Sequence, residues 1–273
     1  MKRRSFIKNI SLAGIGLSGL NTITGDNKRF DTYISNRPPI NDRTYTSKAV
    51  EELINFIKSN IKDPQLSWIF ENCYPNTIDT TVDYELIDGK PDTFIITGDI
   101  DAMWLRDSTA QVWPYLPLVK KDKKIKNLIK GLINRQAKCV IRDPYANSFY
   151  KDLSKISVHN KDIPTPIAGV HEQKWEVDSL CYVIRLSYKY YKLTGDNSIF
   201  DETWIKSSKL IYDTFLTEQR KDGKSPYRFI RNGTAMVDAP LFSGTGRPFK
   251  PNGMICSMFR PSDDATMYPF LIP

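Results

Sequence analysis

The sequence predicts a mostly helical protein, and three observations support this. After residue 47, apolar residues recur with a helical period, long loops follow long helices, and strands do not alternate with helices. The last observation argues against a doubly wound parallel sheet. We expect sheet only in short pieces near residues 93–100 and 223–250. Of the 273 residues, 40% are hydrophobic and 26% are charged, which is the composition of a globular rather than a disordered chain.

The first predicted helix follows Ser47, a residue type that favours the N-cap position. Its apolar face carries Val50, Leu53, Ile54, Ile57 and Ile61. A shorter helix is expected over residues 65–72. The polar residues 75–92 predict an irregular segment, and the apolar run 93–97 predicts a short buried strand.

Four longer helices are expected in the rest of the chain. They cover residues 107–119, 123–141, 178–193 and 199–219. Pro114 should kink the first of these, because proline removes a helical hydrogen bond. Gly195 should end the third, because glycine readily adopts the left-handed conformation found at helix ends.

Two long loops, over residues 143–173 and 223–261, follow these helices. Long loops inside compact domains usually carry function, so we expect binding residues on them. A further helix is predicted to begin at residues 262–264, where Ser and Asp suit a helix start.

Residues 1–25 have the features of an export signal. Basic residues stand near the start, and residues 10–23 are apolar or small, uncharged, and too few to span a bilayer comfortably. The run Arg3-Arg4-Ser5-Phe6-Ile7-Lys8 resembles a twin-arginine signal, which predicts an exported, periplasmic protein. Residues 26–46 are polar and are interpreted as a linker, and residues 47–273 as the folded domain.

The charge of the chain argues against a nucleic-acid-binding protein. Residues 1–25 hold four of the 39 basic residues and none of the 31 acidic ones, so the remainder carries +4 against +8 for the whole chain. A nucleic-acid-binding domain needs a concentrated basic face. No stretch after the signal approaches the length of a membrane span.

The cysteines and histidines follow no metal-binding pattern. His159 and His171 stand twelve residues apart, which is no known ligand spacing, so we expect no metal. The cysteine spacings match no zinc or redox motif, which favours free thiols and leaves one long-range disulfide open. The cysteines are Cys73, Cys139, Cys181 and Cys256.

Three predicted helix starts share a pattern in which a large planar side chain stands three positions before an acid. The pairs are Trp104 and Asp107, Trp175 and Asp178, and Arg260 and Asp263. N-capping explains the acids but not the planar side chains. If these helices form the inner ring of an α/α toroid, the pairs converge at one end. Aromatic rings, carboxylates and an arginine together suit a carbohydrate site.

The residues around these pairs resemble the motifs of glycoside hydrolase family 125. The matching runs are TGDIDAMWLRDS over residues 97–108, HEQKWEVDS over residues 171–179 and FRPSDDA over residues 259–265. The similarity extends from about residue 47 to the last residue, and three motifs in the same order make it specific.

The resemblance implies an all-α fold, the (α/α)6 barrel, and an exo-α-1,6-mannosidase that needs neither metal nor cofactor. It implies a mannose-containing oligosaccharide as the partner, and no nucleic acid. We count about six helices against twelve in the family's barrel, so residues 47–273 correspond to the N-terminal part of the catalytic domain. We therefore expect these 273 residues alone to hydrolyse mannosides very poorly.

The resemblance also implies the catalytic roles. An inverting glycosidase uses an acid and a base whose carboxyl groups lie about 6.5–9.5 Å apart. The family's general acid lies in the segment matched by residues 260–265, and we assign it to Asp263. Asp264 would cap the helix or hold a sugar hydroxyl, and like-charge repulsion between the two would keep Asp263 protonated. The family's general base is a glutamate beyond the matched region.

The remaining candidates are substrate-binding residues. Arg106 and Asp107 are expected to hold adjacent hydroxyls of the terminal mannose, although a surface ion pair would explain them too. Trp104 and Trp175 could be sugar platforms or core residues. Asp99 and Asp101 flank the turn into the first motif, and one of them could be only a turn residue. The further candidates are Asp99, Trp104, His171, Glu172, Lys174, Trp175, Asp178, Arg260 and Asp264.

Two alternatives to the exo-α-1,6-mannosidase stay open. One is an inverting exo-glycosidase of the same fold with another sugar specificity. The other is an inactive fragment that binds sugar weakly, since half a toroid exposes helix faces that should be buried.

Overall fold

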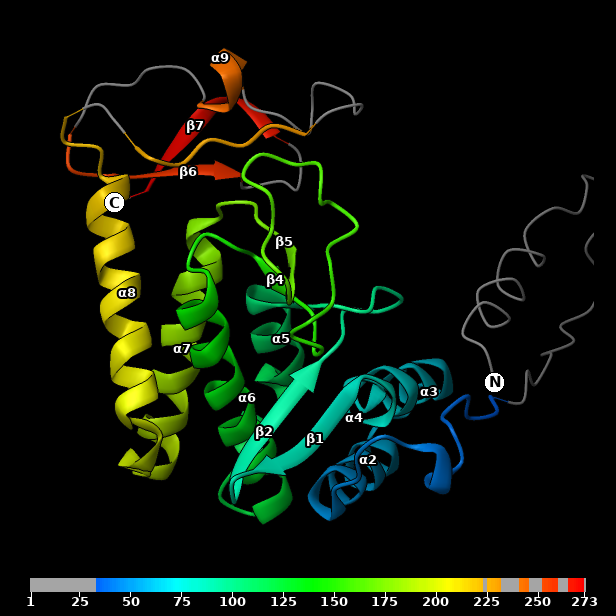
Figure 1. The fold of residues 1–273 in the computed structure, drawn as a ribbon. Coiled ribbons are helices and arrows are strands. Elements are labelled where there is room, and N and C mark those ends of the chain that lie inside the picture. Colours follow the sequence, from blue (N-terminus) through cyan, green and yellow to red (C-terminus); the bar gives the residue numbers. More distant parts are fainter. Residues whose placement is uncertain (1–32, 223–224, 232–240, 246–251, 260–264, 273) are drawn as a thin grey trace, which may run out of the picture.

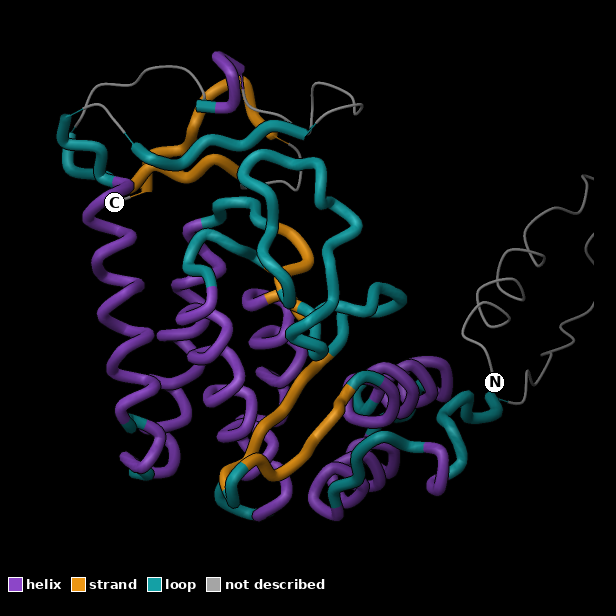
Figure 2. The backbone as a smooth tube through the Cα atoms, in the orientation of Figure 1, coloured by secondary structure: helices purple, strands orange, loops and turns teal. Residues whose placement is uncertain are grey.

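The structure, a computed structural model, describes residues 33–222, 225–231, 241–245, 252–259 and 265–272. Helices dominate these residues, and the strands are short (Figures 1 and 2). The helices are α2 (Lys48–Asn60), α3 (Pro64–Cys73), α4 (Asn76–Thr80), α5 (Leu105–Val112), α6 (Lys123–Arg142), α7 (Val177–Thr194), α8 (Glu202–Glu218) and α9 (Leu241–Gly244). The strands are β1 (Val82–Ile87), β2 (Lys90–Ile95), β3 (Met103–Trp104), β4 (Ser148–Phe149), β5 (Val170–Glu172), β6 (Ile255–Phe259) and β7 (Ala265–Ile272).

Helix α6 lies at the centre of the core. It packs against β2 on one side and against α7 and α8 on the other (Figure 1). Gly131 permits the close approach to β2, because a Cβ at this position would collide with Oγ1 of Thr93. The same Thr93 hydroxyl donates to the Leu128 carbonyl oxygen at 2.9 Å. Near the end of α6, the buried Gln136 Nε2 donates to Leu105 O at 3.1 Å, which ties the start of α5 to the core.

The helices predicted between residues 47 and 219 are confirmed to within a few residues. Ser47 caps α2, its Oγ accepting from Val50 N at 3.2 Å. Gly195 ends α7 in the left-handed conformation, with a φ of 68°. The proline effect is confirmed as well, since α5 stops at Val112 and a 3-10 helix, η2 (Trp113–Leu118), takes over around Pro114.

The prediction of an irregular segment over residues 75–92 is wrong. Residues 82–95 form a β-hairpin, β1–β2, in which Val82 pairs with Ile95 and Ile87 with Lys90. Asp88 and Gly89 form the turn with φ values of 51° and 75°. Asp-Gly is a strong signal for a two-residue hairpin, because both central residues of such a turn need a positive φ.

The prediction of a helix from residues 262–264 onward is wrong too. Residues 265–272 form strand β7, which pairs antiparallel with β6, Ile255 opposite Ile272. Residues 260–264 themselves lie outside the described part of the chain. The segment that follows them is rich in aromatic and β-branched residues, which favour strands. The third start of the proposed repeat is therefore not followed by a helix.

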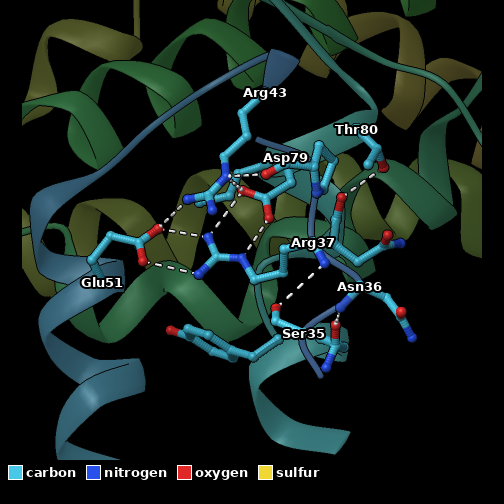
Figure 3. Close-up of polar contacts among 12 residues, drawn as sticks. Ser35, Asn36, Arg37, Arg43, Glu51, Asp79 and Thr80 are labelled. Atoms are coloured by element: carbon cyan, nitrogen blue, oxygen red, sulfur yellow. Dashed lines mark hydrogen bonds and ion pairs between the residues drawn. The ribbon is translucent and has the colours of Figure 1, made fainter. Parts of the chain in front are cut away.

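An ion-pair cluster holds the segment before α2 on the domain. Arg37 donates from Nη2 to Glu51 Oε1 at 2.6 Å and from Nε to Asp79 Oδ2 at 2.8 Å. Arg43 joins the same cluster with Nη1 at 2.8 Å from Glu51 Oε1 (Figure 3). Because the Asp79 side chain is only 2% exposed, the cluster compensates a buried charge at the end of α4.

The all-α prediction is confirmed in its coarse form, a helical fold with a few short strands. The described residues do not show the closed barrel of six helical hairpins. Helices α5, α6, α7 and α8 lie side by side, and loops with strands β4 and β5 gather at one end of them (Figures 1 and 2). The candidate site lies at this end.

Candidate active site

A small sheet brings the first two motifs together. Strand β4 lies between β3 and β5, so that Ser148 pairs with Trp104 on one side and with Glu172 on the other. The backbone N–H of Leu105 also donates to the carbonyl oxygen of Asn147 at 3.1 Å. These bonds place the first turns of α5 and α7 next to each other. The long loop over residues 143–173 thus builds the site, as loops of that length were expected to do.

A cavity of about 210 Å³ opens between the two helix starts. It is lined by Thr97, Ile100, Trp104, Arg106, Asp107, Asn147, Glu172, Lys174 and Glu176. Its wall combines an aromatic ring with groups that accept and donate hydrogen bonds. Within the described residues, Oγ1 of Thr97 is buried and has no hydrogen-bond partner. A ligand hydroxyl in the cavity would provide one.

Arg106 is the cation to which the carboxylates of both helix starts converge. Its Nη2 lies 2.9 Å from Asp107 Oδ2, and its Nη1 lies 3.2 Å from Glu176 Oε2 and 3.7 Å from Asp178 Oδ2. The Arg106 and Asp107 side chains are 21% and 30% exposed. This pair is therefore accessible from the cavity and is held in a fixed geometry by a second helix.

Glu172 is an ionised carboxylate held by three donors. Asn147 Nδ2 donates to its Oε2 and Arg231 Nη2 to its Oε1, both at 2.9 Å, and Lys174 Nζ lies 3.5 Å from Oε1. Burial raises the pKa of Glu172, but Lys174, Asn147 and Arg231 outweigh burial and leave the pKa below its usual value. Glu172 thus offers a charged acceptor at the cavity wall.

Glu176 is a functional candidate that the sequence reasoning missed. Its side chain is 2% exposed, and burial raises its pKa to about 8 although Arg106 lowers it. Asp178 and Glu172 raise the pKa further by like-charge repulsion. Strongly perturbed carboxyl groups in clefts are typical of functional sites. Because Glu176 lies within the second motif, its presence there is evident from the sequence, but its burial is not.

Three predicted residues of the second motif occupy different surroundings. The Trp175 ring is buried, with Nε1 donating to Cys256 O at 2.7 Å and an edge contact to Tyr145, and it does not line the cavity. Lys174 lines the cavity, and Asp178 lies beside Arg106. The structure therefore places Trp175 in the core beneath the site, in agreement with the interpretation of this tryptophan as a core residue.

His171 lies behind the cavity wall. Its ring meets Trp104 edge-on at a centroid distance of 5.1 Å, and its Nδ1 lies 3.0 Å from Ser148 Oγ. Burial lowers the pKa of His171 to about 4, so the imidazole is neutral at pH 7. In this position His171 supports the Trp104 ring rather than lining the cavity.

Four further candidates lie outside the cavity or outside the described residues. Asp99 is exposed in the turn between Gly98 and β3 and does not line the cavity. Arg260, Asp263 and Asp264 lie outside the described residues, so the assignment of the general acid stays a prediction.

Arg231 and Asp162 are two more residues that sequence reasoning missed. Arg231 Nη2 donates to Asp162 Oδ2 at 2.6 Å as well as to Glu172. A β-bridge between Ile163 and Ile230 joins the two long loops beside this pair. Lone charged residues in loops carry no sequence signal for such a contact, because the pairing depends on how the loops fold.

A search of the described residues finds no group of three or more His, Cys, Asp or Glu side chains arranged to hold a metal ion. In the same part of the chain, every helix is too short or too polar to cross a membrane.

Comparison with known proteins identifies the family. The sequence profile of glycoside hydrolase family 125, the metal-independent α-mannosidases, matches residues 63–273. The chain belongs to this family. The resemblance seen in the three motifs is therefore confirmed for most of the chain.

Two relatives illustrate the extent of the match to family 125. The meiotically up-regulated gene 157 protein of Schizosaccharomyces pombe is 40% identical in an alignment 255 residues long, which covers 87% of this chain and 50% of that protein. A metal-independent α-mannosidase of Streptococcus pneumoniae, solved as a non-productive complex with α-1,6-mannobiose, is 42% identical with a TM-score of 0.76. That alignment covers 84% of this chain and 53% of the solved chain. The chain thus spans about half the length of both relatives.

Proposed function

We propose that this protein acts in the removal of terminal α-1,6-linked mannose from glycans, as an inverting exo-mannosidase that requires no metal. The observation that carries the proposal is the cavity at the starts of α5 and α7, which Trp104 and the Arg106–Asp107 pair line within a family 125 domain. The solved relative that binds α-1,6-mannobiose supports the choice of sugar and linkage.

The residues of the cavity suit a hexose. A sugar ring has an apolar face that packs on an aromatic side chain and hydroxyl groups that accept from or donate to charged side chains. Trp104 provides the ring, and Arg106 and Asp107 provide donor and acceptor for adjacent hydroxyls. Glu172 and Lys174 provide a second donor–acceptor pair on the β5 side.

The chemistry we propose is a direct displacement at the anomeric carbon. Asp263 donates its proton to the leaving glycosidic oxygen, and a carboxylate on the opposite face of the sugar ring removes a proton from the attacking water. The family resemblance supports the role of Asp263. The proton lost by Asp263 is balanced by the one that the base takes from water, so no cofactor is consumed.

The test measures hydrolysis of α-1,6-mannobiose by a full-length version of the protein, since these 273 residues alone are expected to hydrolyse mannosides very poorly. NMR identifies the anomer that is released first. We expect β-mannose as the first product, unchanged rates in EDTA, and no action on the α-1,6-linked glucose disaccharide. Asp263→Asn should abolish turnover and leave mannobiose affinity nearly unchanged, because amide and acid are almost isosteric. Binding and hydrolysis of the glucose disaccharide instead would favour the alternative of another sugar specificity. Undiminished turnover by Asp263→Asn would move the acid role to another residue.

We also propose that the protein is exported through the twin-arginine route to the periplasm. The Arg3-Arg4 pair and the uncharged, apolar or small run over residues 10–23 support this proposal. An exported protein would meet glycans outside the cytoplasm.

A further inference from the structure

We infer that Glu176 is a positioning residue of the sugar site, which fixes the guanidinium of Arg106 and acts on the sugar only through it. The inference rests on the proposed function for the identity of the ligand. It gives a role to a carboxyl group of the second motif that the proposed reaction does not use.

The first support is the division of contacts around Arg106. Nη2 binds Asp107, which is on the same helix, whereas Nη1 binds Glu176, which is at the N-cap of α7. The two contacts, at 2.9 and 3.2 Å, hold the guanidinium plane at two separate nitrogens. An arginine side chain has several rotatable bonds, so a second anchor on another element is what fixes its direction.

The second support is burial. The Asp107 side chain is 30% exposed, whereas that of Glu176 is only 2% exposed. A sugar in the cavity can therefore displace solvent from Arg106 and Asp107, whereas Glu176, which also lines the cavity, exposes almost no surface to it. Its position is that of a support rather than of a primary ligand.

The third support is that Glu176 is itself rigidly held. Ser179 Oγ donates to its Oε2 at 3.1 Å, and Asn147 Nδ2 donates to its Oε1 at 3.3 Å. Asn147 is anchored in turn, because its carbonyl oxygen accepts from Leu105 N, the residue before Arg106. The side chain of the buried Asn147 thus contacts Glu176, while its backbone contacts the segment that carries Arg106.

The charges around Arg106 show what the loss of Glu176 would do. The other two carboxylates near the guanidinium, Asp107 and Asp178, are 30% and 28% exposed. Without Glu176, Arg106 would keep its contacts to these two outer groups and lose the hydrogen bond from Nη1 to the buried Oε2. The guanidinium would lose its inner anchor and sample several directions, which lowers the fraction of molecules ready to bind a sugar.

Burial raises the pKa of Glu176 to about 8, so a neutral side chain of the same shape should serve nearly as well at pH 7. Glu176→Gln keeps a carbonyl oxygen for Arg106, whereas Glu176→Leu keeps the volume and loses the hydrogen bonds. Asp92→Asn is the matched control, because Asp92 on β2 is a buried partner of Arg135 on α6 and neither residue lines the cavity.

The experiment has two readouts at pH 7. The first is the side-chain Nε–H signal of Arg106 in protein labelled with ¹⁵N-arginine, assigned from its loss in Arg106→Ala. The second is the affinity for α-1,6-mannobiose by calorimetry. Circular dichroism and thermal melts of every variant show that it is folded.

We expect Glu176→Leu to broaden or shift the Arg106 signal and to weaken mannobiose binding by about tenfold or more. Glu176→Gln should stay within about threefold of the wild type, and Asp92→Asn should change neither readout. In an Arg106→Ala background, Glu176→Leu should change the affinity by less than about twofold, because a residue that acts through Arg106 has no effect without it.

Two results would overturn the inference. One is an Arg106 signal that Glu176→Leu leaves unchanged. The other is an equal loss of affinity on Glu176→Leu with and without Arg106. A wild-type protein that binds no mannobiose would instead refute the proposed function, and the Arg106 signal would still decide whether Glu176 positions the guanidinium.

Discussion

Trp104 and Glu172 lie on opposite sides of Ser148, each paired with it in the three-stranded sheet β3–β4–β5. This relationship joins two motifs that are far apart in the chain and sets the first turns of α5 and α7 next to each other. Trp104 and Glu172 line the same cavity because β4 pairs with both of their strands. The predictions below follow from this arrangement and from the ion pairs around it.

Arg106→Lys is expected to weaken binding of α-1,6-mannobiose by about tenfold or more. Lysine keeps the charge but cannot bind Asp107 and Glu176 from two separate nitrogens in one plane. Calorimetric titration at pH 7 measures the loss. Lys130→Arg, on the outer part of α6, is the control and should bind as the wild type does. An affinity unchanged in Arg106→Lys would remove Arg106 from the site.

Glu176 should make the protein less stable as pH rises from about 6.5 to 8. Its pKa is raised from 4.5 to about 8 in the folded protein, so the folded state keeps a proton that the unfolded chain has already released. Stability from this group is complete below pH 4.5 and is lost as pH rises through 8. Urea unfolding of wild type and Glu176→Gln across this range should show a smaller slope in the variant. Parallel curves would mean that Glu176 is ionised in the folded state.

His171 should have the opposite effect on the pH dependence of stability, below pH 6.5. Its pKa is lowered from 6.5 to about 4, so between these values the unfolded chain takes up a proton that the folded protein refuses. The contribution of His171 to stability should therefore fall as pH drops from 6.5 towards 4.5, opposite in sign to that of Glu176. His171→Phe keeps a ring against Trp104 and should flatten this fall in thermal melts. His159, whose pKa burial also lowers, contributes in the same direction and should account for the remaining slope.

Arg37→Met is expected to destabilise the fold by about 3 kcal/mol, because it leaves the buried carboxylate of Asp79 without its main partner. Arg43→Met is the matched control. Arg43 lies 3.7 Å from Asp79 and mainly contacts the more exposed Glu51, so its removal should cost about 1 kcal/mol (Figure 3). Chemical denaturation measures both. Equal losses in the two variants would contradict the central role of Arg37.

A fusion of residues 1–30 to a folded reporter should reach the periplasm through the twin-arginine route. Changing Arg3-Arg4 to Lys-Lys should block export, which cell fractionation detects. Export that persists in this variant would indicate the general secretory route or another signal.

Much of the helical framework could be predicted from local patterns. The N-cap at Ser47, the break at Pro114 and the end at Gly195 all act within one helical turn, so nearby residues are sufficient to reveal them. The signal for the β1–β2 hairpin, the Asp88-Gly89 turn, is equally local, but the polar composition of residues 75–92 conceals it. The strand β7 was missed because its partner, β6, is what decides between helix and strand there.

By itself, the sequence determined the family, the helical class and the two described motifs that supply the cavity, since these depend on residue types at short spacings. Only the tertiary structure decided which of those residues face the cavity. It buried Trp175 in the core, set His171 behind Trp104, and made Glu176 the inner anchor of Arg106. The physical reason is that burial and ion pairing depend on side chains brought together from distant parts of the chain. The same glutamate would be an ordinary ionised residue on an exposed turn, whereas burial, with the nearby carboxyl groups of Asp178 and Glu172, raises its pKa in the folded protein.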